Sequence, residues 1–173
     1  MASILKTPSS GGNIGSGISW TNTGYIYTEN GSGASVSLSA FAYSLYLTSS
    51  GYSFSIPSNA TINGIVVEVK RNAPSYGIRD NSVSLYYGGL AGSAKSLSSN
   101  IPYAFTWITF GSPTDMWGLT TVQLTPSIVN YMGFGACYKA MAYQSGTFSC
   151  GVDQIRMTVY YTLPNKGSFF QIM

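Results

Sequence analysis

Hydrophobic and polar residues alternate with a period of two along much of the chain, which is typical of strands that bury one face. Residues 62–71 give the clearest example, with Ile65, Val67 and Val69 on one face and charged side chains among those on the other. Further strands are predicted at residues 52–56, 83–87, 95–97, 103–110, 119–124, 134–143 and 152–162. Eight to ten short antiparallel strands separated by turn residues are typical of an all-β sandwich or barrel.

Two local breaks interrupt the strand pattern. In the first clear strand, the apolar positions are even-numbered up to Ala40 and odd-numbered from Phe41 onward, and this one-residue slip predicts a β-bulge or a bend. Thr125 followed by Pro126 is a favourable start for a helix, because Thr caps the first turn and Pro suits its first position. We therefore expect one short helical turn near residues 126–131.

The 173 residues are enough for one domain, and local composition divides them into three parts. Residues 1–19 are rich in Gly, Ser and Asn and are predicted to form an extended N-terminal arm. Residues 20–163 are assigned to a single β-sandwich domain. Residues 164–173 form a C-terminal tail with apolar side chains that include Phe169 and Phe170. Because so apolar a tail should be buried, we expect both terminal segments to dock on neighbouring subunits.

The chain lacks histidine and has only two cysteines and five carboxylates, which excludes several kinds of catalytic and metal site. Ser-His-Asp and Cys-His catalysis and His-ligated zinc or iron all require the missing imidazole. The carboxylates are scattered along the sequence and form no pair of the kind that a glycosidase uses. We therefore expect a protein that is not an enzyme and that carries no cofactor.

Charge and hydropathy also limit the partners that the chain can have. Charged residues make up 8% of the chain and the net charge of +3 is spread over eight Lys and Arg residues, which is too sparse for a nucleic-acid surface. The N-terminal residues lack the apolar core of a signal peptide, and no apolar run is long enough to span a membrane. The sequence predicts a protein made in a cytoplasm, with neither nucleic acid nor membrane as a partner.

Three aspartates in turn-rich sequence are weak candidates for a calcium site, because Ca²⁺ takes six to eight oxygen ligands. They are Asp80, Asp115 and Asp153, and their spacing is not that of an EF-hand loop. The competing interpretation is structural, with Asp115 capping a turn through backbone amides and Asp153 paired with Arg79 or Arg156.

Cys137 and Cys150 flank the last predicted hairpin, so they could lie opposite one another and form a cross-strand disulfide. Assembly in a reducing cytoplasm favours free thiols instead. We expect two free, half-buried cysteines, and a disulfide that forms only after release stays open as the alternative.

Aromatic side chains supply the candidate contact surface. The chain has 14 Tyr, and strand alternation turns one member of each adjacent pair, at 86–87 and 160–161, away from the core. An outer sheet face with Tyr and few charges suits subunit contacts or a glycan. The candidate contact residues are Trp107, Trp117, Tyr86, Tyr160, Phe169 and Phe170. For Trp117 the competing interpretation is that its ring plugs one end of the sandwich.

Five stretches of the chain resemble a domain of tailed-bacteriophage and prophage virion proteins. They are FSIPSNATINGIVVEVKRNA from residue 54, RDNSVSLYYGGLAGSAKS from 79, TFGSPTDMWGLT from 109, VNYMGFG from 129 and VDQIRMTVYY from 152. The resemblance spans residues 52–162, whereas residues 20–50 match only loosely. It implies a β-sandwich of jelly-roll type, similar to carbohydrate-binding modules, and a structural role in the virion without catalytic residues.

Two functions follow as hypotheses. The first is a structural component of a tailed-phage virion, a capsid decoration or head-fibre protein. It would assemble as a homo-oligomer, with a trimer expected, and dock on major capsid or tail proteins through Tyr-rich faces and terminal segments. The alternative is a glycan- or receptor-binding module of a tail fibre or adhesin, with a host surface glycan as partner. This alternative predicts an exposed groove that contains Trp107 or Trp117.

Overall fold

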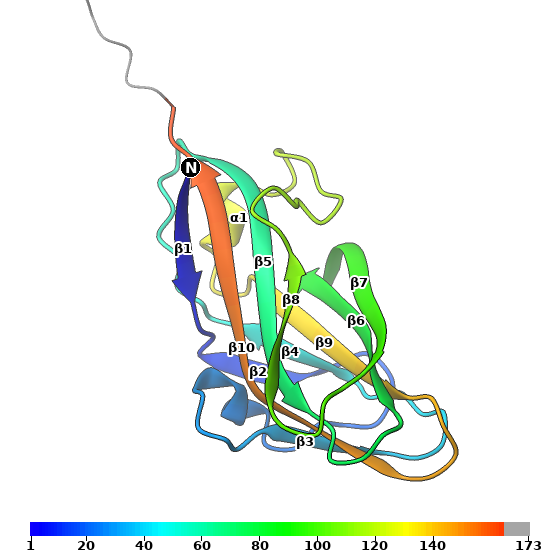
Figure 1. Ribbon diagram of the computed structural model, residues 1–173. Helices are drawn as coiled ribbons and strands as arrows, with labels where there is room; N and C mark the ends of the chain where they lie inside the picture. Colours follow the sequence, from blue (N-terminus) through cyan, green and yellow to red (C-terminus); the bar gives the residue numbers. More distant parts are fainter. Residues whose placement is uncertain (165–173) are drawn as a thin grey trace, which may run out of the picture.

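The computed structural model describes residues 1–164 and contains two five-stranded antiparallel sheets packed face to face (Figure 1). The first sheet has the order β1-β10-β5-β8, and β3 pairs with the part of β10 that β1 leaves free. The second sheet has the order β2-β4-β9-β6-β7. The strands of the first sheet are β1 (Ala2–Lys6), β3 (Ala34–Leu38), β5 (Thr61–Asn72), β8 (Thr106–Gly111) and β10 (Phe148–Thr162). Those of the second are β2 (Ser10–Ile14), β4 (Tyr46–Ser50), β6 (Ile78–Tyr86), β7 (Leu90–Asn100) and β9 (Gly135–Ala142).

The eight strands from β3 to β10 are paired in a nested order. The innermost pair is β6 with β7, followed outward by β5 with β8, β4 with β9 and β3 with β10. Successive pairs alternate between the two sheets, so the chain forms one long hairpin rolled into a sandwich. This topology is a jelly roll, and it confirms the predicted all-β sandwich.

Aliphatic side chains from both sheets fill the space between them. Ile65, Val67 and Val69 in β5 are fully buried, as their alternation predicted. In the adjacent β10, Met157 is opposite Val67 and Ile155 is opposite Val69, and both are fully buried as well. Burial of one such side chain contributes about 1.5–3 kcal/mol, so this pair of central strands is a large part of the core.

One ion pair is buried between the two sheets. The Arg71 guanidinium, at the end of β5, donates to the Asp80 carboxylate of β6, with 2.8 Å between Nη2 and Oδ2. The Tyr138 hydroxyl in β9 also donates to Asp80, at 2.7 Å. Because these hydrogen bonds come from both sheets, the buried charge is compensated and the sheets are joined at this point.

The N-terminal segment is part of the sandwich, so the prediction of an extended arm over 1–19 is wrong. Strand β1 pairs with β10 from Met157 to Tyr161, and β2 pairs with β4 in the other sheet. Strand β10 has 15 residues, and β3 pairs only with its first part. The rest of this edge of β10 is therefore available to β1. Strand β2 is rich in Gly and was therefore not predicted from the sequence. Within it, Gly11 allows the close approach of the Thr23 carbonyl oxygen, which a Cβ atom would prevent.

The slip in apolar phase at Ala40 marks a change of sheet and not a β-bulge. Strand β3 ends at Leu38 in the first sheet, and β4 begins at Tyr46 in the second. The buried side of the chain reverses when the chain crosses between sheets, so the alternation reverses too.

Two predicted strands are absent from the described part of the chain. Residues 52–56 are extended without strand pairing, although Tyr52, Phe54 and Ile56 are buried. Residues 119–124 form turns in the connection between β8 and β9. In both segments apolar side chains fill the core from a loop, and a sequence pattern does not separate that case from a short strand.

The predicted helical turn is confirmed as α1 (Pro126–Val129). The Thr125 side chain accepts a hydrogen bond from the Ile128 N–H, and Pro126 begins the helix. A 3-10 helix, η1 (Thr23–Tyr27), packs against β10. Within residues 1–164, no helix has the length and apolar character needed to cross a membrane.

Candidate functional site

Four loops gather at one end of the sandwich, the lower end in Figure 1. They connect β3 to β4, β5 to β6, β7 to β8 and β9 to β10, and cover residues 39–45, 73–77, 101–105 and 143–147. We call this the loop end. The turn between β6 and β7 and the long connection between β8 and β9 lie at the opposite end.

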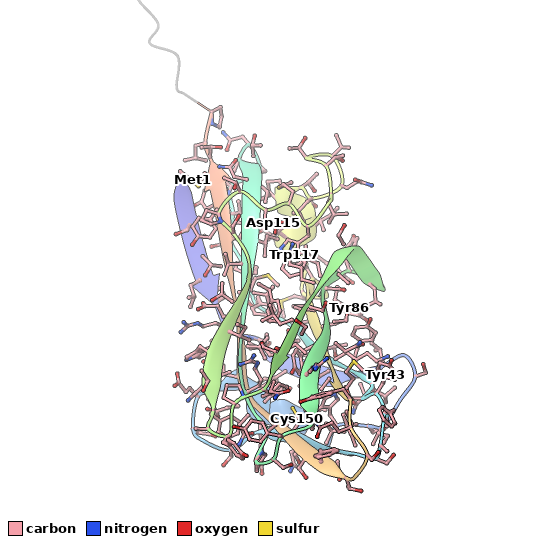
Figure 2. The ribbon with its side chains drawn as sticks, turned by 45° about the vertical axis from the view of Figure 1, so that its right-hand side comes forward. Met1, Tyr43, Tyr86, Asp115, Trp117 and Cys150 are labelled. Carbon is pink, nitrogen blue, oxygen red and sulfur yellow. The ribbon has the colours of Figure 1, made fainter. Side chains whose placement is uncertain are left out.

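Each of the four loops carries at least one aromatic side chain. The loops contain six aromatic residues, and we call Phe41, Tyr43, Tyr76, Tyr103 and Tyr143 the loop-end aromatics; the sixth, Phe105, lies against Gly151 of β10. Phe41, Tyr76 and Tyr103 are 61%, 58% and 52% exposed, and Tyr143 is half-buried. The rings of Tyr76 and Tyr103 meet edge to face, with 4.8 Å between centroids. Figure 2 shows Tyr43 toward this end and Trp117 toward the other.

Phe41 has a backbone conformation that side chains other than Gly rarely adopt. Its φ angle is +57°, in the left-handed region. A bulky residue in this region costs about 1–2 kcal/mol. Because most of the Phe41 ring is exposed, burial of the ring does not compensate this cost, and such strain often marks a functional position.

Two cations near the loop end have aromatic neighbours but no ion-pair partner within residues 1–164. The Arg79 guanidinium lies 3.7 Å from the ring centroid of Tyr143. The Lys139 ammonium is 5.4 Å from the ring centroid of Tyr43 and 5.0 Å from that of Tyr46. The nearby Asp80 carboxylate already pairs with Arg71, so the accessible charge at this end is positive.

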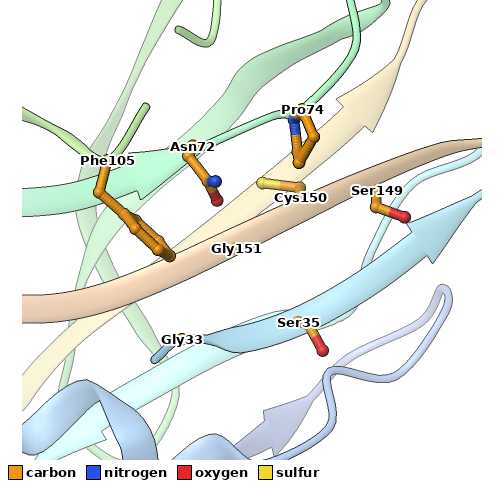
Figure 3. Close-up of a pocket in the computed structure, with 8 residues that line it drawn as sticks. All are labelled: Gly33, Ser35, Asn72, Pro74, Phe105, Ser149, Cys150 and Gly151. Carbon is orange, nitrogen blue, oxygen red and sulfur yellow. The ribbon is translucent and has the colours of Figure 1, made fainter. Parts of the chain in front are cut away.

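Two cavities border the loop end. One, of about 180 Å³, is drawn in Figure 3 and is lined by Gly33, Ser35, Asn72, Pro74, Phe105, Ser149, Cys150 and Gly151. The other, of about 190 Å³, is lined by Arg79, Asp80, Asn81, Ser96, Leu97, Ser98 and Met141. The first has no charged lining residue, whereas the second contains the guanidinium of Arg79.

The three candidate calcium ligands lie apart from one another, and each is paired with a cation. Asp115 is 2.6 Å from the Lys95 ammonium, and Asp153 is 3.0 Å from that of Lys70, whereas Asp80 pairs with Arg71 as described above. Within the described residues, no three side chains of the metal-binding types come together. The proposed metal candidates are therefore not brought into one site.

The structural interpretation of these aspartates is right for Asp115 and wrong in detail for Asp153. The Asp115 carboxylate accepts from the Trp117 N–H at 2.7 Å, so it caps the turn as expected. Asp153 accepts from the backbone N–H groups of Asn30 and Gly31 and pairs with Lys70, not with Arg79 or Arg156. Asp153 lies at a β-bulge, since the register of β10 against β5 shifts between Val152 and Gln154.

Trp117 can contact neither a sugar nor a neighbouring subunit, because its side chain is fully buried. Its indole N–H donates to the Ile65 carbonyl at 2.9 Å, and the Lys95 ammonium lies 4.8 Å from its ring centroid. The ring closes the sandwich between β5 and the β8–β9 connection, as the structural interpretation proposed. The assignment of Trp117 to an interface or glycan site is therefore wrong.

The other predicted contact residues do not form one site. Trp107 is half-buried on the outer face of the first sheet, where the Arg156 guanidinium lies 4.0 Å from its ring centroid. Tyr160 is also in the first sheet and Tyr86 ends β6 in the second, and both are half-buried. The structure does not bring these three side chains together. Phe169 and Phe170 lie outside the described residues, so their predicted role is not addressed.

The two cysteines are free and buried, and they belong to different sheets. Cys137 is in β9 and Cys150 is in β10, so the expectation that they flank one hairpin is wrong. Burial raises the pKa of the Cys137 thiol to about 12. It also raises the pKa of Cys150, so neither thiol is a ready nucleophile at neutral pH.

The comparisons with known proteins find a distant structural similarity and no match by sequence. No protein-family model and no curated protein matches the sequence. A solved structure described as "CBM4 structure and function" matches with a TM-score of 0.42 and 12% sequence identity. The match covers 88% of this chain and 92% of that chain. A similarity this distant does not support an assignment of function.

Proposed function

We propose that this chain is a non-enzymatic binding module that holds a glycan at the loop end. The observation that carries the proposal is the placement of the loop-end aromatics. Four loops that are separate in sequence present aromatic rings at one end of the sandwich, beside two cations that have no ion-pair partner among the described residues.

The chemistry of the loop end suits a sugar, which has both apolar C–H faces and hydroxyl groups. Tyr rings offer flat apolar area with little loss of side-chain entropy, and their hydroxyls form hydrogen bonds at the rim. Asn and Ser side chains line the cavity beside Arg79 and provide further donors and acceptors. A few polar groups beside aromatic surface are typical of small-ligand sites.

The carboxylates favour binding over hydrolysis. All five of them, Glu29, Glu68, Asp80, Asp115 and Asp153, form ion pairs with Lys or Arg. A glycosidase needs two carboxyl groups facing one sugar, one of them available as an acid. None of the five carboxylates lies in the four loops of the loop end, and Asp80, which lines the cavity beside Arg79, is buried. This arrangement supports a module without catalytic activity.

The test is glycan-array binding followed by titration calorimetry on the best ligand. We expect the double variant Tyr76→Ala, Tyr103→Ala to lose at least about 10-fold in affinity, since about 1.4 kcal/mol of contact is removed. The matched control is Tyr25→Ala, which truncates an exposed Tyr in η1, outside the four loops. Equal binding by all three proteins, or no glycan binding by the wild type, would contradict the proposal.

A second function, assembly in a virion, is favoured by apolar surface at the opposite end. Exposed side chains there are Tyr87, Leu90, Val122, Tyr131 and Met132, and the rings of Tyr87 and Tyr131 meet edge to face. Monomeric proteins rarely leave such clusters unpartnered. We propose that this end contacts sister subunits or a shell or tail protein, as the resemblance to phage virion proteins implies. The two functions are compatible because they use opposite ends.

Assembly is tested by the mass of the purified protein in solution and by its copy number in purified particles. Light scattering should give a trimer or another closed oligomer, and Tyr131→Ser with Met132→Ser should reduce its mass. A monomer at all concentrations, together with absence from particles, would rule out this second function.

A further inference from the structure

Arg79 is held in one orientation by its neighbours, although no carboxylate holds it. Its guanidinium stacks on the Tyr143 ring at 3.7 Å. The Tyr143 hydroxyl in turn hydrogen-bonds with Asn100, which ends β7. Stacking of this kind fixes the plane of the guanidinium and leaves its N–H edge available to a partner.

The Nε atom of Arg79 is buried and has no hydrogen-bond partner in the described structure. Buried N–H groups are nearly always paired with protein atoms or ordered water, so the Arg79 guanidinium lacks its full set of partners within the described protein. Arg79 also lines the cavity of about 190 Å³, together with Asn81, Ser96 and Ser98. The unpaired donor and the cavity therefore occur at the same residue.

The charges around this cavity leave Arg79 uncompensated. Asp80 is the only acidic residue in the cavity lining. Its Oδ1 accepts from Arg71 Nε and from the Tyr138 hydroxyl, and its Oδ2 accepts from Arg71 Nη2. Because both oxygens are used by these donors, the positive charge of Arg79 is available to an anion from solution.

We propose that this cavity binds the carboxylate of a uronic-acid residue within a glycan. The inference rests on the proposed function and names the sugar class that the loop end selects. A guanidinium edge and a carboxylate match as two parallel hydrogen bonds between opposite charges, and these are stronger than the bonds that the hydroxyls of a neutral sugar accept. The Ser and Asn side chains of the lining suit the ring hydroxyls next to the acid, and the Tyr143 ring extends the site toward the loop-end aromatics.

The experiment compares polyuronates with neutral polymers of the same sugars. Galacturonan, glucuronan and alginate oligosaccharides are titrated beside their carboxyl-reduced forms. We expect at least one acidic oligosaccharide to bind the wild type 10-fold or more tightly than its reduced form, and this preference to fall as salt is raised.

The variants assign the preference to one residue. Arg79→Gln should remove the preference for the acid, so that the acidic and reduced oligosaccharides bind equally. Lys6→Gln is the matched control, because Lys6 lies in β1, outside the loop end, and forms no ion pair within residues 1–164, so this variant should keep the preference. Arg79→Lys keeps the charge without the two-pronged geometry and should keep only part of the preference. It also serves as the second variant if Arg79→Gln does not fold.

Several results would overturn the inference, and they separate it from the proposed function. Equal binding of the acidic and reduced forms by the wild type leaves glycan binding intact and rejects the uronic-acid site. Equally tight binding of a glutamate oligomer of the same charge rejects the sugar and indicates an acidic peptide. No binding of any glycan rejects both proposals.

Discussion

The two ends of the sandwich use the same kind of contact, a cation over an aromatic ring, for different purposes. At the end opposite the loop end, which we call the closed end, Lys95 lies over the buried Trp117 ring and also pairs with Asp115, whose carboxylate accepts from the Trp117 N–H. At the loop end, Arg79 lies over Tyr143, and no carboxylate completes the set among the described residues. Lys95 thus has a carboxylate partner within the chain, whereas Arg79 has none among the described residues.

This difference separates structural aromatics from candidate binding ones better than residue type does. Trp117 is the most noticeable side chain in its sequence motif, yet every polar group around it has a partner. Arg79 only begins one of the five quoted stretches and Tyr143 stands in none, yet Arg79 lines a cavity and has an unpaired donor. Because the Arg79 guanidinium has no carboxylate partner among the described residues, a ligand that carries a carboxylate could provide one.

The largest expected effect is the loss of the closed end in Trp117→Ala. Removing a fully buried Trp side chain costs about 3–5 kcal/mol of unfolding free energy, and here the Ile65 carbonyl also loses its donor. Urea denaturation should show the variant unfolded or close to it. Tyr103→Ala, the matched truncation at the loop end, should change stability by less than about 1 kcal/mol. Similar costs for the two would remove the distinction between the ends.

A second stability test concerns the ion pair that lies between the sheets near the loop end. Arg71→Met leaves the Asp80 carboxylate buried without its cation, and we expect a loss of about 3 kcal/mol or more in urea denaturation. The double variant Arg71→Met, Asp80→Leu should be more stable than the single one, because no uncompensated charge remains. A single variant as stable as the wild type would show that this pair does not join the sheets.

The dependence of the free energy of unfolding on pH, measured below neutral pH, gives a smaller test of the closed end. Burial by itself raises the pKa of Asp115, but hydrogen bonds from Lys95 and the Trp117 N–H outweigh it and hold the pKa below its ordinary value. A carboxyl whose pKa is lowered on folding stabilises the protein above its unfolded pKa, near 4, and loses this contribution as pH falls through the folded pKa.

Asp115→Asn should therefore be less stable than the wild type at pH 7, by up to about 1 kcal/mol for a partly exposed pair. The gap in urea midpoint should narrow below pH 4. A gap that stays constant from pH 7 to pH 2.5 would mean that the charge of Asp115 does not contribute.

Much of the fold could be predicted from the sequence, because burial leaves a local mark. The alternation at Ile65, Val67 and Val69 and the cap at Thr125 each depend on neighbouring residues, and both predictions were right. The N-terminal strands were missed because each has only five residues and no regular alternation: β2 is SGGNI, and β1 is ASILK with two apolar residues side by side. The pairing of β1 also depends on the length of the distant β10. The phase slip at Ala40 was visible, but only the topology shows that it is a change of sheet.

The candidate site could not be predicted, because its members come together only through the jelly-roll pairing. Phe41, Tyr76, Tyr103 and Tyr143 each sit in a loop between two strands, and no spacing in the sequence relates them. The sequence did contain one usable signal, which is the aromatic residues in every second loop from the β3–β4 loop onward. A rolled hairpin brings these loops to the same end of the sandwich. The unpaired state of Arg79 had no local signal, because it depends on Asp80 being taken by Arg71.

The smallest expected effect tests whether strain at the loop end serves binding. Phe41→Gly removes a backbone cost of about 1–2 kcal/mol in the left-handed region and adds about 0.5–1 kcal/mol of chain entropy in the unfolded state. The variant should be more stable than the wild type by about 0.5 kcal/mol in urea denaturation, while its glycan affinity falls. Phe41→Ala is the control, since it loses the ring but keeps the strained backbone, and should lose affinity without the gain in stability. If Phe41→Gly binds as tightly as the wild type, neither the ring nor the strained backbone of Phe41 has a part in recognition, and Tyr43 is the remaining aromatic candidate in this loop.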